Sequence, residues 1–201
     1  MDTINRRDLL KLISAAPVAA SFALTDAEAQ QAHHQVQQAR QTAKSTGKPF
    51  APKFFTAHEY QAVRILSDMI IPADERSGSA TDAGVPEFMD FTMVDQPARQ
   101  VAMRGGLAWL DAECQRRFDK PFVASAEAQR VDVLDAISTY GQVDPRLRHG
   151  QAFFRSFRDL TATGFWTTKM GISDLGYTGN TVVAKWEGCP PEQLKKLGLL
   201  A

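Results

Sequence analysis

Histidines have the widest range of chemistry among the residues of this 201-residue chain, because imidazole can act as an acid, a base or a metal ligand near neutral pH. The chain has four of them, His33, His34, His58 and His149. His33 and His34 are adjacent, so on a helix they would point in different directions and make a poor pair of metal ligands. A catalytic dyad or metal centre needs a histidine beside a carboxylate or a cysteine, and the sequence spacing suggests no such pair.

The two cysteines, Cys114 and Cys189, leave three alternatives open. Cys114 has helical neighbours at Leu107 and Leu110, which suits a buried free thiol. Cys189 follows Trp186-Glu187-Gly188 in a segment that we expect to be exposed. In an oxidising compartment the two cysteines can pair with each other, one can bridge to a partner chain, or both can stay free.

Other reaction motifs are missing from the sequence. It contains no glycine-rich dinucleotide fingerprint, phosphate-binding loop, nucleophile elbow, haem-attachment motif or zinc-spaced cysteines. Asp74, Glu75 and Asp82 lie in an acidic loop that invites comparison with a calcium site, but Arg76 and the lack of regularly alternating oxygen ligands disfavour it. We therefore expect no catalytic, cofactor-binding or metal-binding residue in this chain.

Composition excludes several classes of partner. The 23 basic side chains are balanced by 23 acidic ones, which removes any whole-chain argument for nucleic-acid binding. A hydrophobic content of 44% is ordinary for a globular protein of one domain. No stretch is long and apolar enough for a conventional membrane span, so we expect contact with a membrane only through partners.

The N-terminal segment has the features of an export signal. Arg6 and Arg7 precede the modestly apolar run Leu12–Leu24, and Ala27-Glu28-Ala29 follows as a small-x-small cleavage site. Residues 1–29 therefore fit a twin-arginine signal, a type used for proteins that cross the membrane already folded. The alternative is an ordinary amphipathic N-terminal helix.

Cleavage at that site would start the mature chain near Gln30. Residues 30–53 are rich in glutamine and alanine and have few apolar anchors, so we expect a flexible, partly disordered linker. Proteins use a folded-state export route when they must acquire a cofactor or a partner in the cytoplasm.

Residues 54–163 have the periodicity of a helical body. Thr56-Ala57-His58-Glu59 is a capping box, and the apolar residues after it recur at helical spacing until Ile71, before Pro72. Within the body, Gly105-Gly106 would allow close approach of a neighbouring helix or a kink. Four further helices are expected from Val85, from about Pro97 to Phe118, from Ser125 to about Tyr140, and from Pro145 through Leu160.

No run alternates apolar and polar residues long enough for a sheet. The predicted fold is therefore all-α, a compact orthogonal or bundle-like array of about five helices. It is preceded by the disordered signal and linker and followed by a long irregular arm.

Residues 164–201 form this expected C-terminal arm. Its glycines supply turns, and its large apolar side chains Phe165, Trp166, Tyr177 and Trp186 must cover some surface. Two alternatives stay open: the arm packs over its own helical body, or it lies partly on another protein.

Four short motifs resemble the gluconate 2-dehydrogenase subunit 3 family, the small subunits of membrane-associated flavoprotein dehydrogenases. The resemblance covers Phe55–Leu199 and includes the signal. Its most specific parts are Leu66–Asp74 (LSDMIIPAD), Asp82–Phe88 (DAGVPEF), Lys169–Asn180 (KMGISDLGYTGN) and Trp186–Pro190 (WEGCP).

The resemblance implies a heteromeric periplasmic complex that oxidises a sugar, sugar acid or glycoside. The catalytic partner is an FAD-containing protein of the glucose–methanol–choline type, often accompanied by a third subunit, a cytochrome with haem c. The small subunit carries no cofactor and no catalytic residue, and it can carry a flavoprotein that lacks its own signal through the twin-arginine route. The candidate contact residues for this partner are Phe165, Trp166, Lys169, Tyr177, Asn180, Trp186 and Cys189.

The competing hypothesis is a free-standing exported helical domain that binds a small molecule or acts as an enzyme in its own right. Such a domain would be soluble and monomeric alone, whereas an obligate subunit would expose an apolar patch and aggregate.

Overall fold

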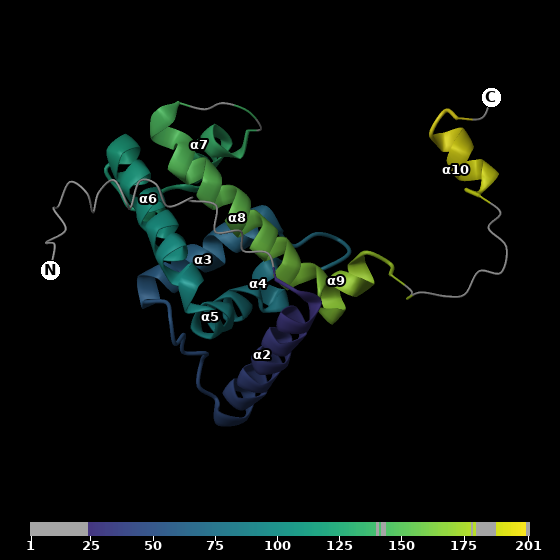
Figure 1. Cartoon of the computed structure of the whole chain (residues 1–201), viewed down its shortest axis with the longest axis horizontal. Helices are drawn as coiled ribbons and strands as arrows, with labels where there is room; N and C mark the ends of the chain where they lie inside the picture. The colour runs from purple at the N-terminus through teal and green to yellow at the C-terminus, as the bar shows by residue number, and fades with distance from the viewer. Residues whose placement is uncertain (1–23, 140, 142–143, 178, 180–187, 200–201) are drawn as a thin grey trace, which may run out of the picture.

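The structure, a computed structural model, describes residues 24–139, 141, 144–177, 179 and 188–199. These residues contain nine α-helices and no strand, so the expected all-α fold is confirmed (Figure 1). The helices are α2 (Asp26–Thr46), α3 (Ala57–Ile70), α4 (Ala80–Ala83), α5 (Val85–Asp95), α6 (Gln100–Phe118), α7 (Glu127–Ser138), α8 (Arg148–Trp166), α9 (Lys169–Asp174) and α10 (Pro191–Lys196). Short 3₁₀ turns at Pro97–Arg99, Phe122–Ala124 and Pro145–Leu147 precede α6, α7 and α8.

The five helices expected from the sequence correspond to α3, α5, α6, α7 and α8. Helix α3 begins as predicted, because the Glu59 amide donates to Thr56 Oγ1 at 3.2 Å and the Thr56 amide donates to Glu59 Oε2 at 2.8 Å. It ends at Ile70, one residue before the predicted Ile71 and two before Pro72. Pro86 lies in the first turn of α5, where its missing N–H needs no partner.

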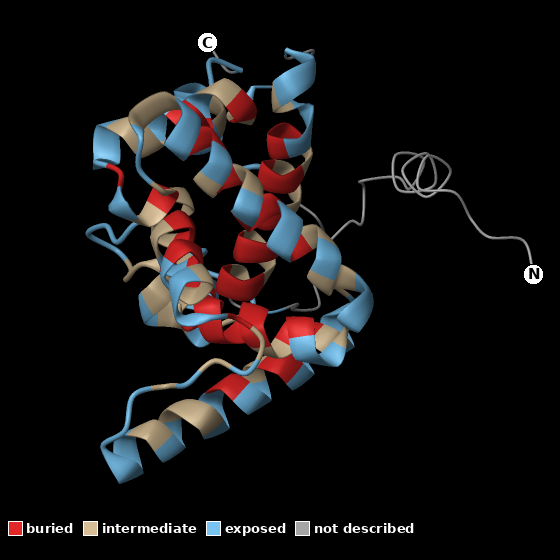
Figure 2. Ribbon diagram, turned by 90° about the vertical axis from the view of Figure 1, so that its left-hand side faces the viewer, coloured by how far each residue is buried: buried red, intermediate tan, exposed pale blue. Residues whose placement is uncertain are grey.

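Helix α8 is the centre of the body, and α3, α5, α6, α7 and α9 all pack against it (Figure 1). Its buried face follows from helical spacing: Phe153, Phe157 and Leu160 fall at i, i+4 and i+7 and are at most 6% exposed. Figure 2 shows the buried residues of the surrounding helices turned toward the same interior. The apolar stripe of α8 therefore forms the middle of one continuous core, which the surrounding helices complete.

Helices α6 and α8 approach closely at Gly106, which is one of the two outcomes expected for Gly105-Gly106. Helix α6 runs unbroken through both glycines, so they cause no kink. A Cβ atom at Gly106 would stand 1.8 Å from the Phe153 ring of α8, whereas one at Gly105 would meet nothing within 4 Å. On α8, a Cβ atom at Gly150 would lie 2.3 Å from the indole ring of Trp109 on α6. Each helix therefore contributes a glycine that accommodates an aromatic ring of the other.

The prediction of a flexible linker over residues 30–53 is wrong for most of that segment. Residues 26–46 form the 21-residue helix α2, which packs against α5 and buries Ala29, Ala32 and Val36. These three residues lie on one helical face. Two of them are alanines, so the face carries no pattern of large apolar residues that would predict a buried helix. Alanine favours helix strongly, and its small side chain lets α2 lie close to the body.

The expected arm over residues 164–201 also starts too early. Gly164 to Trp166 complete α8, and Phe165 is fully buried. A further six residues form α9, and α10 lies apart from the other helices (Figure 1). In the described part of the chain, no helix has both the length and the apolarity needed to span a bilayer.

Candidate functional site

Three exposed apolar residues lie in and directly after α9. We call Ile172, Leu175 and Tyr177 the α9 face; they are 39%, 60% and 56% exposed, although all three are large apolar side chains. Lys169, in the first turn of α9, is also exposed. Exposed apolar side chains that cluster on one short element are typical of a surface that another molecule covers.

The α9 face is held firmly against α8. The Thr168 side chain caps α9 by accepting from the Gly171 amide at 3.0 Å. Gly171 lies so near the end of α8 that a Cβ atom there would stand 2.3 Å from the Phe165 carbonyl oxygen. Only glycine permits this contact, so the direction of α9 is set by backbone packing.

The turn after α9 fixes Tyr177 beside the helix. Gly176 has a left-handed φ of 65°, and the Tyr177 amide returns to the Ile172 carbonyl at 3.2 Å. This arrangement is a Schellman motif, in which the residue after the left-handed glycine meets the last turn of the helix. The backbone of Tyr177 is therefore held beside the last turn of α9, close to Ile172 and Leu175.

An ion pair links α9 to the acidic loop. Arg76 Nε lies 3.4 Å from Asp174 Oδ1, and the Arg76 guanidinium also donates to the Asp174 carbonyl oxygen. Arg76 is mostly exposed, so this pair adds little stability. Its effect is to connect two segments that the sequence separates by 98 residues.

The sequence-predicted contact residues divide into three groups. Phe165 is fully buried and Trp166 half-buried, with ring centroids 4.9 Å apart in an edge-to-face pair. Phe165 is therefore a core residue and offers no free surface. Lys169, Tyr177 and Cys189 are exposed. The remaining predicted residues, Asn180 and Trp186, lie outside the described residues, as do the signal residues Arg6 and Arg7.

Aspartates in the acidic loop and at the end of α3 accept hydrogen bonds from backbone amides. Asp68, on α3, accepts through Oδ1 from the Thr81 amide in the first turn of α4 at 2.7 Å. Asp74 Oδ1 accepts from the amides of Arg76 and Ser77, and these bonds lower its pKa. Within the described residues, no group of three or more histidines, cysteines or carboxylates is arranged to hold a metal ion. These acidic motif residues have a structural role.

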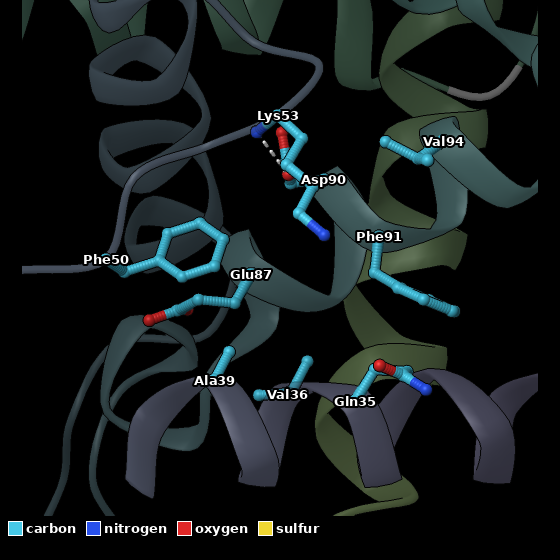
Figure 3. Close-up of a pocket in the computed structure, with 9 residues that line it drawn as sticks. All are labelled: Gln35, Val36, Ala39, Phe50, Lys53, Glu87, Asp90, Phe91 and Val94. Atoms are coloured by element: carbon cyan, nitrogen blue, oxygen red, sulfur yellow. Dashed lines mark hydrogen bonds between the residues drawn. The ribbon is translucent and has the colours of Figure 1, made fainter. Parts of the chain in front are cut away.

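A groove of about 100 Å³ between α2, α5 and the segment before α3 contains two further carboxylates (Figure 3). Both carboxylate oxygens of Asp90 accept hydrogen bonds from the backbone amides of Lys53, Phe54 and Phe55, at 2.8–3.1 Å. Glu87 differs: Oε1 lies 3.2 Å from the Arg40 guanidinium, while the buried Oε2 has no hydrogen-bond partner. The residues that line the groove are Gln35, Val36, Ala39, Phe50, Lys53, Glu87, Asp90, Phe91 and Val94.

One histidine–carboxylate pair escaped the sequence analysis. His58 Nε2 lies 2.6 Å from Asp111 Oδ2, and Asp111 Oδ1 accepts from the Phe122 amide at 2.9 Å. The two residues are 53 positions apart, so only the packing of α3 against α6 brings them together. A second groove lies beside this pair and is lined in part by Thr56, whose hydroxyl oxygen caps α3. The pair links α3 to α6.

The structure also decides one of the cysteine alternatives. Both thiols are free, so the internal pair between Cys114 and Cys189 is not formed. Cys114 is buried in α6, and burial raises the pKa of its thiol, which disfavours the reactive thiolate. Cys189 is exposed, and a bridge from it to a partner stays a prediction.

Comparison with known proteins gives one match. A family model described as gluconate 2-dehydrogenase subunit 3 matches residues 57–186, which run from the start of α3 past the α9 face. No curated protein and no solved structure gives a significant match.

Proposed function

Because the chain belongs to the gluconate 2-dehydrogenase subunit 3 family, we propose that it is the non-catalytic small subunit of a periplasmic, FAD-dependent dehydrogenase of the glucose–methanol–choline type. It binds the flavoprotein, aids its folding and stability, and takes it through the twin-arginine route. FAD belongs to that partner, and a third subunit with haem c passes the electrons on. The partner also selects the sugar, sugar acid or glycoside.

The observation that carries the binding role is the α9 face. Leu175 and Tyr177 each expose more than half of their surface, although both are large apolar side chains. Their backbone is fixed by the Schellman turn and by Gly171, so little conformational entropy is lost when a partner covers them. A rigid apolar surface beside an exposed lysine fits the apolar core and polar rim of a protein interface.

The test is copurification with a flavoprotein of the glucose–methanol–choline type from the same organism, and a flavoprotein gene next to that of this chain is the first candidate to try. Leu175→Asp and Tyr177→Asp should each weaken binding by more than about tenfold, because a charge would be buried in the interface. Val101→Asp is the matched control, since Val101 on α6 is 83% exposed and lies outside the α9 face. Equal affinity of the α9 variants and the control would contradict the proposal.

The export role has its own test. Replacing Arg6 and Arg7 by lysine should leave both this chain and the flavoprotein in the cytoplasm, because the paired guanidiniums are the signal that is read. Cell fractionation with antibodies to both chains measures the outcome. A flavoprotein that still reaches the periplasm would refute the carrier role and leave the binding role intact.

The second candidate function is that of a free-standing binding domain. The groove between α2 and α5, which Glu87 lines, favours it. A buried carboxylate oxygen without a donor, set in a partly apolar groove, suits a small aliphatic ligand that ends in an ammonium or hydroxyl group. n-Butylamine and 1-butanol are simple probes, and NMR shifts of groove residues report binding. Binding that Glu87→Gln abolishes, in a chain that stays monomeric and ignores the flavoprotein, would favour this function over the subunit role.

A further inference from the structure

The first turn of α2 is a complete helix start. Thr25 is its N-cap: the Thr25 side chain accepts from the Glu28 amide, and Glu28 Oε2 accepts from the Thr25 amide at 2.8 Å. Leu24, just before the cap, is half-buried and packs against the core. The order of apolar residue, cap and capping box is that of a helix N-terminus with a hydrophobic staple, and it makes Leu24 part of the folded body.

This first turn is also attached to the rest of the body. Ala29 is 1% exposed, and Glu28 Oε1 accepts from Gln96 Nε2 at 2.8 Å, at the end of α5. One turn further on, the ring of His33 stacks on Phe88 with centroids 4.8 Å apart. Residues 25–29 are therefore part of the core structure and not an appendage to it.

The far half of α2 is fixed as well. Arg40 donates to the carbonyl oxygens of Thr81 and Asp82 at 2.8 Å and pairs with Glu87. Val36 lies so close to Gly84 that a Cβ atom there would stand 3.0 Å away. Because both halves are held, the first turn cannot leave the body without breaking contacts along α2.

These contacts conflict with cleavage between Ala29 and Gln30. Proteases act on exposed, flexible chain, whereas this bond lies in the first turns of a docked helix. Cleavage there would remove the N-cap and would place a new ammonium group at the positive end of the helix dipole. In a chain exported already folded, the bond is protected when the peptidase meets it.

We propose that the leader is removed between Ala23 and Leu24, so that the mature chain begins at Leu24; this inference rests on the proposed export. Ser21-Phe22-Ala23 is a small-x-small site in the sequence directly before Leu24. A signal peptidase would add water across the Ala23–Leu24 peptide bond, leaving a carboxylate on Ala23 and an ammonium group on Leu24. The cap, the Glu28–Gln96 bond and all of α2 stay in the mature protein.

The test is the N-terminus of the exported full-length chain, measured by intact mass and by N-terminal sequencing. The expected first residue is Leu24. Two variants put a large residue into one site each: Ala23→Tyr at the last position of the proposed site, and Ala27→Tyr at the third-last position of the Ala29 site. Ala27 is exposed on α2, so its substitution leaves the core intact.

Ala23→Tyr should leave the precursor uncut, while Ala27→Tyr should be processed to Leu24 like the parent chain. A mature chain that begins at Gln30, or a block of processing by Ala27→Tyr, would overturn the inference. A chain that keeps Met1 would overturn it too. The location of that uncut chain separates the two hypotheses: in the periplasm it leaves export standing, and in the cytoplasm it refutes export as well.

Discussion

Phe153 of α8 lies directly over Gly106 of α6. A Cβ atom at Gly106 would stand 1.8 Å from Phe153 Cδ2, which is inside the ring's van der Waals surface. Phe153 also packs against Phe157 with ring centroids 5.5 Å apart, so the ring has little room to move aside. The contact sets how closely α6 and α8 pack against each other.

Gly106→Ala should lower the free energy of unfolding by about 1–3 kcal/mol, because the added methyl group overpacks the interface. Gly105→Ala is the matched control: a Cβ there meets nothing within 4 Å, so it should stabilise α6 by about 0.5–1 kcal/mol. Denaturant unfolding of the two variants measures both effects. The same sign of change for both would show that Phe153 does not constrain Gly106.

Asp90→Asn should destabilise the connection between α2 and α3. The Asp90 carboxylate accepts hydrogen bonds from three backbone amides. In asparagine, an NH₂ group replaces one of these oxygens, and it cannot accept a bond from the N–H group that it would meet. We expect a loss of about 1–3 kcal/mol in unfolding free energy. Asp95→Asn, at the exposed end of α5, is the control and should change it by less than about 0.5 kcal/mol. If the two variants unfold alike, the Asp90 bonds contribute little.

His33 should make the fold sensitive to mild acid. Burial lowers the pKa of His33 below its usual value of 6.5, so the folded state prefers the neutral ring. The unfolded chain takes up the proton first as pH falls. Stability is therefore full above about pH 6.5 and declines toward the lower folded pKa, by at most about 1.4 kcal/mol per pH unit.

The measurement for His33 is the slope of unfolding free energy against pH between 7.5 and 5. His33→Gln should flatten it, whereas His34→Gln should not, because the adjacent His34 is exposed. An unchanged slope in His33→Gln would assign the acid sensitivity to other groups.

Phe165 and Leu175 should separate stability from binding. Phe165→Ala removes a fully buried ring and should lower the unfolding free energy of the isolated chain by about 3–5 kcal/mol. Leu175→Ala, at a 60% exposed position, should change it by less than about 0.5 kcal/mol and still weaken flavoprotein binding. Thermal unfolding and copurification of the same two variants give both readouts. An unchanged unfolding free energy in Phe165→Ala would contradict the core role of Phe165 and support its earlier assignment as a contact residue.

Local signals in the sequence were sufficient for the helices of the body. The capping box at Thr56, Pro86 in a first turn and the aromatic stripe of α8 each depend on neighbours within a few residues, and the structure confirms them. Helix α2 was missed because its buried face is made mainly of alanine. Its docking depends on distant partners such as Gln96 and Phe88, which no local pattern reveals.

The candidate site shows the same division. The sequence by itself determined the helical class, the family and the concentration of aromatic residues after position 164, because residue type and short spacing carry that information. Only the tertiary structure decided that Phe165 is core while Leu175 and Tyr177 are surface, and that His58 meets Asp111. Burial and long-range pairing depend on how whole helices pack, and packing follows from the shapes of side chains far apart in the sequence.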